Sequence, residues 1–103
     1  MNSLPTSPAP AAIADVTSVA ASATAVTLLA ANSRRVSFIV FNDSSAIAYI
    51  KFGSGATATD YSVKLTAGQM YEPPANAVYI GLITGVWGSA TGHARITELS
   101  ESR

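Results

Sequence analysis

The residues best suited to chemistry in this 103-residue chain are one histidine and a few hydroxyl side chains beside it. His93 is a candidate general base, and Ser89 and Thr91 precede it closely. A base of this kind needs a nucleophile within reach and an acid that orients it. Nothing in the neighbouring sequence marks either hydroxyl as activated. The pattern therefore favours a surface histidine at the start of a strand.

The acidic residues do not form a metal-binding motif. Asp43, Asp60, Glu72 and Glu98 occur singly, and the chain lacks the D-x-[DN]-x-[DN]-G run whose closely spaced oxygens hold calcium. The chain has no cysteine, which excludes disulfides and thiolate metal sites. We therefore predict no catalytic residue, no metal and no cofactor, and we expect a protein that is not an enzyme.

A glycine-rich segment and the aromatic residues are two further candidates. Residues 53–57 resemble a phosphate loop but lack the lysine and the following helix that such a loop requires, so we interpret them as a linker. The aromatic residues are typical of a small β-domain core, although aromatic side chains are also enriched in interfaces. Tyr49 and Tyr79 each lie opposite an isoleucine-rich face. They are our candidates for an exposed platform that binds protein or carbohydrate.

Charge is sparse and balanced along the chain. Six basic and six acidic residues cancel, and charged residues make up 12% of the sequence, compared with roughly 25% in an average soluble domain. Because such a surface resists association poorly, we expect a partner or further copies of the chain to cover much of it. The alternative is a monomer solubilised by Ser and Thr. Arg34 and Arg35 form the only basic cluster, interpreted as a solvated turn, and we expect no nucleic-acid partner.

The length predicts one domain, and the hydropathy predicts no membrane partner. The longest uncharged run near the N-terminus, residues 16–33, contains too much Ser, Thr and Asn for a membrane span, which needs ~20 mostly apolar residues. No Lys or Arg precedes the first apolar stretch, and we therefore expect no secretory signal peptide, which begins with such a charged region.

The N-terminal segment is rich in proline, with three of the five prolines in residues 1–14. Proline lacks a backbone donor and disfavours helix in the residue before it. We therefore predict an extended arm over residues 1–22 and a β-sandwich domain over residues 23–103. The arm is either a disordered terminus or a tether that lies on a neighbour. The residues expected to make contacts as a tether are Leu4, Pro8, Pro10 and Ile13.

After the arm, short alternating runs predict one strand after another. The predicted strands are residues 25–30, 35–41, 46–52, 61–65, 70–72, 77–83, 86–90 and 93–99. Alternation is expected to bury Phe38 in the core and to point Tyr61, Val63 and Leu65 inward. Residues 35–41 are apolar on both faces, which is typical of a central strand, and a polar turn at 42–45 predicts a hairpin with 46–52. We therefore expect an all-β fold: a small, antiparallel, jelly-roll-like β-sandwich of seven or eight short strands with an extended N-terminal arm.

Several short motifs occur in a defined order between Leu28 and Leu99. They are residues 28–35 (LLAANSRR), 39–44 (IVFNDS), 49–53 (YIKFG), 61–65 (YSVKL), 68–73 (GQMYEP), 85–87 (GVW), 90–95 (ATGHAR) and 96–99 (ITEL). In this order and spacing they resemble a group of small virion proteins of tailed phages. The group includes capsid decoration (cement) proteins, head fibres and small tail-associated subunits.

The resemblance implies a β-sandwich on the phage particle and no inherited catalytic residue. We therefore expect a capsid decoration protein that stabilises the head lattice as a homotrimer, with the N-terminal arm as its tether. The expected partners are the major capsid protein and other copies of the chain. The expected location is the virion, on the head surface, after synthesis in the host cytoplasm. The alternative is a tail- or fibre-associated β-module that binds another virion protein or a host-surface glycan.

Overall fold

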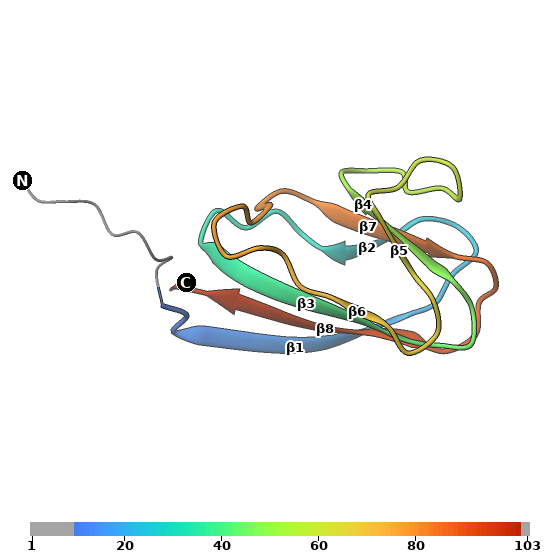
Figure 1. Ribbon diagram of the computed structural model, residues 1–103, viewed down its shortest axis with the longest axis horizontal. Coiled ribbons are helices and arrows are strands. Elements are labelled where there is room, and N and C mark those ends of the chain that lie inside the picture. The colour runs from blue at the N-terminus through green and yellow to red at the C-terminus, as the bar shows by residue number, and fades with distance from the viewer. Residues whose placement is uncertain (1–9, 102–103) are drawn as a thin grey trace, which may run out of the picture.

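The computed structural model describes residues 10–101, which form two β-sheets that pack face to face (Figure 1). The strands are β1 (Ile13–Ala20), β2 (Val26–Leu29), β3 (Arg35–Asp43), β4 (Ala48–Phe52), β5 (Val63–Leu65), β6 (Met70–Tyr71), β7 (Ile83–Trp87) and β8 (His93–Ser100). Sheet A has the order β1-β8-β3-β6 and sheet B the order β2-β7-β4-β5, and all pairs are antiparallel. The predicted all-β fold with two antiparallel sheets is confirmed.

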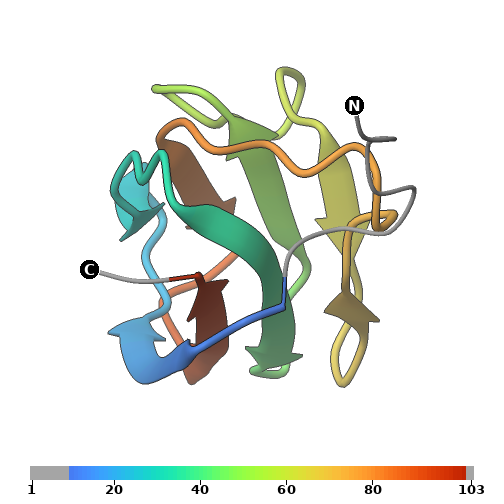
Figure 2. The same cartoon turned by 90° about the vertical axis from the view of Figure 1, so that its left-hand side faces the viewer.

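The strands pair in nested order, the first with the eighth, the second with the seventh, the third with the sixth and the fourth with the fifth. Figure 2 views this arrangement from the end at which β3 begins. Among the described strands, β4 and β5 are the only consecutive pair that are neighbours in one sheet. The predicted hairpin between residues 35–41 and 46–52 is therefore wrong, because the turn after β3 carries the chain across to sheet B.

The first strand lies inside the segment that was predicted as an arm. Ile13–Ala20 pairs with β8 along its whole length without a register shift, so the arm prediction is wrong for these eight residues. Thr17 lies opposite the buried Ile96, which places Asp15 and Thr17 on the inward side of β1. The polar residues at these positions weaken the alternation that would have indicated a strand.

The core lies between the sheets and is centred on Phe38. The side chain of Phe38 is fully buried, and its ring centroid lies 6.2 Å from that of Phe52 and 5.9 Å from that of Tyr71. The other large side chains buried to the same degree come from both sheets: Val40, Asn42, Ile50, Ile83 and Ile96. The alternation in residues 35–41 predicted this inward position for Phe38 correctly.

Phe38→Ala is expected to lower the free energy of unfolding by ~3–5 kcal/mol, since it leaves a cavity among packed rings. Urea unfolding followed by tryptophan fluorescence measures the change. Phe41→Ala, on the opposite and partly exposed face of β3, is the control and should cost less. A loss below ~1 kcal/mol for Phe38→Ala would contradict the register of β3.

Arg35 holds together the loops at the end of the sandwich where β3 begins. Its residue exposure is only 4%, so the predicted solvated turn is wrong for Arg35. The guanidinium donates to the carbonyl oxygens of Tyr79 (2.8 Å), Gly81 (3.1 Å) and Ala30 (2.7 Å), and Nε donates to the Glu98 carboxylate (2.9 Å). Two of these carbonyls lie in residues 77–82, which were predicted as a strand. Their engagement by Arg35 explains why β7 begins only at Ile83.

Asn42 performs the same role near the other end of β3, where it is fully buried. Its side-chain amide donates to the carbonyl oxygens of Ala46 (2.8 Å) and Leu65 (2.9 Å). Its side-chain oxygen accepts hydrogen bonds from Trp87 Nε1 (3.2 Å) and Ser44 Oγ (2.7 Å). One side chain thus links β3, β5, β7 and the turn after β3.

Candidate functional site

The predicted arm residues do not gather into one site. Leu4 and Pro8 lie outside the described residues. Pro10 is exposed and precedes β1, whereas Ile13 is the first residue of β1, is partly buried, and pairs with Ser100. Of the four, Ile13 is therefore part of the sheet rather than of a free arm.

Tyr79 packs on the core between β6 and β7. Its ring stacks on Phe52 with a centroid distance of 5.2 Å and an interplanar angle of 11°. A Cβ added at Gly81 would clash with the Tyr79 hydroxyl and ring, so the glycine lets the tyrosine fold back over the chain. In this position Tyr79 contributes packing and is not part of an open platform.

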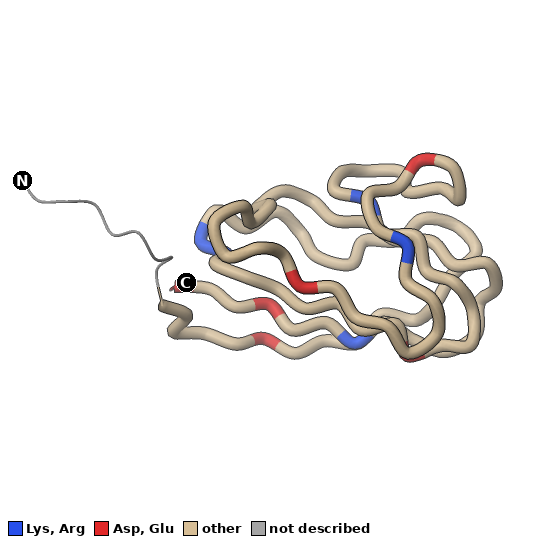
Figure 3. Tube along the Cα trace, in the orientation of Figure 1, with Lys and Arg blue, Asp and Glu red and all other residues tan. Residues whose placement is uncertain are grey.

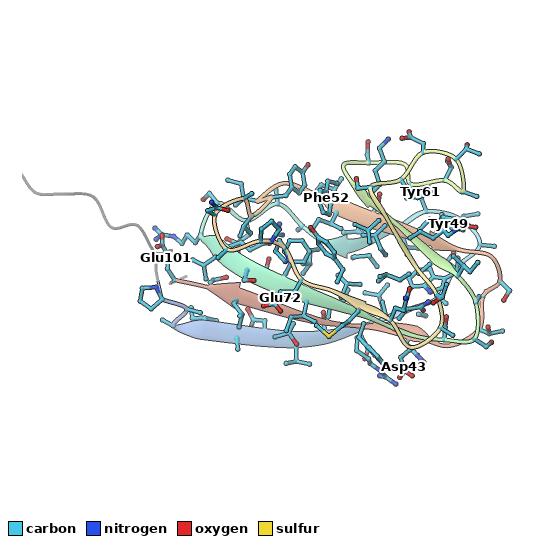
Figure 4. All side chains as sticks on the ribbon, in the orientation of Figure 1. Asp43, Tyr49, Phe52, Tyr61, Glu72 and Glu101 are labelled. Carbon is cyan, nitrogen blue, oxygen red and sulfur yellow. The ribbon has the colours of Figure 1, made fainter. Side chains whose placement is uncertain are left out.

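Tyr49 lies on the outer face of sheet B, opposite Val86 in β7 and Lys64 in β5. Its ring centroid is 5.1 Å from that of Tyr61, and Figure 4 labels the two rings on the same part of the molecule. Tyr61 was predicted to point inward with β5, but it precedes that strand and is 40% exposed. The sequence alternation therefore missed the residue that completes the aromatic pair.

The loop between β4 and β5 folds over the outer face of sheet B. Ala56 donates its backbone N–H to Thr84 Oγ1 (3.2 Å), and this hydroxyl donates to the Gly53 carbonyl (2.7 Å). Lys51 and Asp60 also form an ion pair of 2.6 Å across the base of the loop. Thr84 and Ala56 are consequently buried although they lie outside the core. The glycine-rich segment predicted as a linker is thus a fixed cover on the sheet.

Beside this loop lies an apolar hollow of about 490 Å³. Tyr49, Val86 and Ala56 contribute to its walls, and its other lining residues are Ala23, Thr24, Ala25, Gly55, Thr57, Ala58, Trp87 and Gly88. None of these residues is charged. The volume falls within the range of small-ligand sites. Such a hollow suits a ring or a short apolar group stacked beside Tyr49.

The outer face of sheet A is a second candidate surface. Val16 is 74% exposed and Met70 is 52% exposed. The strand register places Val16, Thr97 and Ile39 in one row and sets Phe41 beside Met70. The outer face of sheet A thus carries apolar side chains from β1 to β6, with Thr97 and Arg95 of β8 between them.

Charged residues are sparse along the described part of the chain, as Figure 3 shows. Arg95 Nε and Asp43 form an ion pair of 2.8 Å at one end of the face, and Arg95 also donates to Ser18 Oγ (2.6 Å). Both charged side chains are about half exposed. Arg95 lies directly opposite Phe41, in the row that also holds Met70, so this charged pair lies on the face itself, beside its apolar side chains.

Within residues 10–101 no group of three or more acidic or histidine side chains is placed to hold a metal ion. His93 is exposed at the start of β8, and nearby Ser89 Oγ and Thr91 Oγ1 lie 3.3 Å from each other. In the same part of the chain, no helix is long and apolar enough to cross a membrane.

Comparison of the chain with models of protein families, with curated proteins and with solved structures finds no match. Functional inference therefore rests on the two surfaces, the strand arrangement and the ordered sequence motifs.

Proposed function

We propose that this protein is a non-enzymatic structural protein of a phage virion, a capsid decoration protein that binds the head lattice. The observation that carries the proposal is the set of apolar side chains on the outer face of sheet A, of which Val16 is 74% and Met70 is 52% exposed. Contiguous exposed apolar surface of this kind marks sites of interaction with other proteins. The proposed partner on this face is the major capsid protein.

The strand arrangement supports the same proposal. We infer that the fold is a jelly roll, because all eight strands pair in nested order across two four-stranded sheets. Jelly rolls recur in viral capsid and lectin domains, although a fold alone does not define a function. The motifs that resemble phage virion proteins form most of the strands and turns between Leu28 and Leu99.

The proposed assembly is a homotrimer with the N-terminal segment as its tether. Several weak contacts on one assembly act together through effective concentration, so a small domain can bind a lattice tightly. The balanced, sparse charge fits this role, because solubility of the free protein is less important once a lattice holds it.

Met70→Glu tests the capsid-binding face. A carboxylate in the apolar face would have to be desolvated on docking, so binding to particles assembled without the protein is expected to fall at least ~10-fold. Co-sedimentation with such particles measures the change. The control is Thr27→Glu, which puts the same charge on an exposed position of β2 in sheet B and should leave binding unchanged. Equal binding by both variants and the unmodified protein would contradict the proposed face.

A second candidate function is favoured by the Tyr49–Tyr61 pair beside the apolar hollow. An exposed aromatic wall suits the apolar face of a sugar ring, and the protein would then be a tail- or fibre-associated module that binds a host-surface glycan. Saturable binding on a glycan array that is lost in Tyr49→Ala and retained in Tyr79→Ala would support it. No binding to any glycan, or equal binding by both variants, would contradict it.

A further inference from the structure

Four strand edges border the two sheets, and three of them carry features that discourage further pairing. The β6 edge has two residues and is followed by Pro73 and Pro74. The β2 edge is irregular, with a register shift between Thr27 and Leu29. The β5 edge has three residues with the exposed Lys64 at its centre. Short length, bulges, lysine and proline are the devices by which natural proteins protect sheet edges.

The β1 edge lacks these features. It is eight residues long, pairs with β8 in an unbroken register, and forms the lower border of the molecule in Figure 1. Val16, near the strand's centre, is 74% exposed, and its outward-facing neighbours are Ala14, Ser18 and Ala20. Its one charged residue, Asp15, lies on the inward side. A long, regular edge with an exposed apolar centre is a template for another strand.

Within β1 the free backbone groups belong to the even-numbered residues, whereas Ala12, just before the strand, donates its N–H to the Ser100 carbonyl (2.8 Å). At the end of the ladder, Ala21 donates its N–H to the carbonyl of Gly92 (2.9 Å). In an antiparallel pair, alternate residues bond to the partner strand, so Val19, Thr17 and Asp15 face β8 in the same way. The N–H and C=O groups of Val16 and Ser18 therefore point away from β8, on the side where no other described strand lies.

We propose that β1 pairs in antiparallel fashion with β1 of a second copy of this chain, about a two-fold axis at Val16. Two A sheets then join into one continuous sheet, and their apolar outer faces merge. A two-fold contact requires the same edge on both copies to be self-complementary. The β1 edge meets this requirement because its outward side chains are small or apolar and its single charged residue, Asp15, lies on the inward side.

The free backbone groups of β1 determine the register of the proposed pair between the two copies. With Val16 opposite Val16, even residues oppose even residues, so free donors meet free acceptors and the outer faces stay aligned. Ala14 then lies opposite Ser18, and Asp15 lies opposite Thr17 rather than opposite the second Asp15. No like charges oppose each other, and the two most exposed valines cover one another. This self-complementarity favours a second copy over an unrelated extended segment.

The inference does not rest on the proposed virion function. A two-fold contact through β1 also differs from the contacts around a three-fold axis. In a trimeric protein the β1 contact would join trimers in pairs. Its failure therefore leaves the capsid proposal standing, and the failure of capsid binding leaves the β1 contact standing.

Two proline substitutions in β1 distinguish a loss of self-association from a loss of folding stability. In Val16→Pro the lost N–H is one that points away from β8, so we expect an unchanged thermal midpoint and loss of self-association. In Thr17→Pro the lost N–H bonds to β8, so we expect a lowered thermal midpoint. Sedimentation velocity over a range of concentrations measures association, starting from the 10.5 kDa chain mass. Unchanged association in a folded Val16→Pro variant would overturn the proposal.

Cross-linking tests the register directly, because the natural chain has no cysteine. Hydrogen-bonded antiparallel residues have Cα atoms about 5.5 Å apart, within the range that a disulfide spans. Val16→Cys should therefore form a disulfide-linked dimer under mild oxidation. Ala14→Cys should not, since its partner position is Ser18. Equal cross-linking of the two variants, no cross-linking of Val16→Cys, or a chain that stays monomeric at all concentrations would overturn the proposal.

Discussion

Arg35→Met is expected to lower the free energy of unfolding by about 3–5 kcal/mol, which is the loss typical of removing one partner from a buried ion pair. The substitution roughly keeps the side-chain volume but removes every donor. It leaves the Glu98 carboxylate, whose side chain is 15% exposed, without its 2.9 Å partner. It also leaves the carbonyl oxygens of Ala30, Tyr79 and Gly81 without the guanidinium.

Urea unfolding measures this loss, and a domain of this size has only ~5–10 kcal/mol of stability to begin with. The matched control is Arg95→Met, which also breaks an arginine–carboxylate pair, but one whose side chains are 50% and 48% exposed. Exposed pairs of this kind contribute about 0–1 kcal/mol. Equal losses in the two variants would contradict the structural role of Arg35.

Asn42→Asp is expected to destabilise the fold by at least ~3 kcal/mol, although it changes the side chain by a single group. The new oxygen can still accept hydrogen bonds, but it cannot donate to the carbonyls of Ala46 and Leu65, which lie 2.8 and 2.9 Å from the amide nitrogen. Each buried carbonyl left without a donor costs about 1–3 kcal/mol. An additional charge in a site without exposure adds to that cost.

The thermal midpoint and the urea midpoint of Asn42→Asp measure its effect. Asn32→Asp is the control: it loses one donor, to Ser100 Oγ (3.0 Å), at a partly buried position. We expect ~1 kcal/mol for this change. A similar small loss for Asn42→Asp would mean that its amide does not hold the strands together.

Strand β3 was predictable because side-chain alternation is a local signal. Val36, Phe38 and Val40 alternate with Ser37 and Ile39, and the strand containing them was located within two residues of its observed end. The alternation also placed Phe38 in the core, where it is fully buried.

The first strand was not predictable from local sequence, because it forms by pairing with β8. The inward positions of β1 include Asp15 and Thr17, so hydrophobic alternation is weak, and the segment forms a strand by pairing with β8 at the other end of the chain. Strand formation of this kind depends on tertiary context rather than on propensity. The hairpin predicted after residue 41 failed for a related reason: the turn signal was real, but it did not indicate to which sheet the chain would pass.

The candidate surfaces were predictable only in part. Tyr49 was selected from its position opposite an isoleucine-rich face, and it does line the apolar hollow. Tyr61 was assigned to the wrong face, because the predicted strand began two residues before the first residue of β5, Val63. Arg35 was grouped with Arg34 as a solvated turn, since the carbonyls that it binds come from two other loops and leave no local sequence pattern.

The proposal that a phage encodes this chain and carries it on the head is best tested by cryo-electron microscopy of intact particles of that phage. Density for the sandwich is expected to repeat over the head lattice, with the outer face of sheet A, around Met70 and Phe41, against the capsid subunits. Density confined to the tail or neck, or no density for the chain on the particle, would contradict the proposed decoration role.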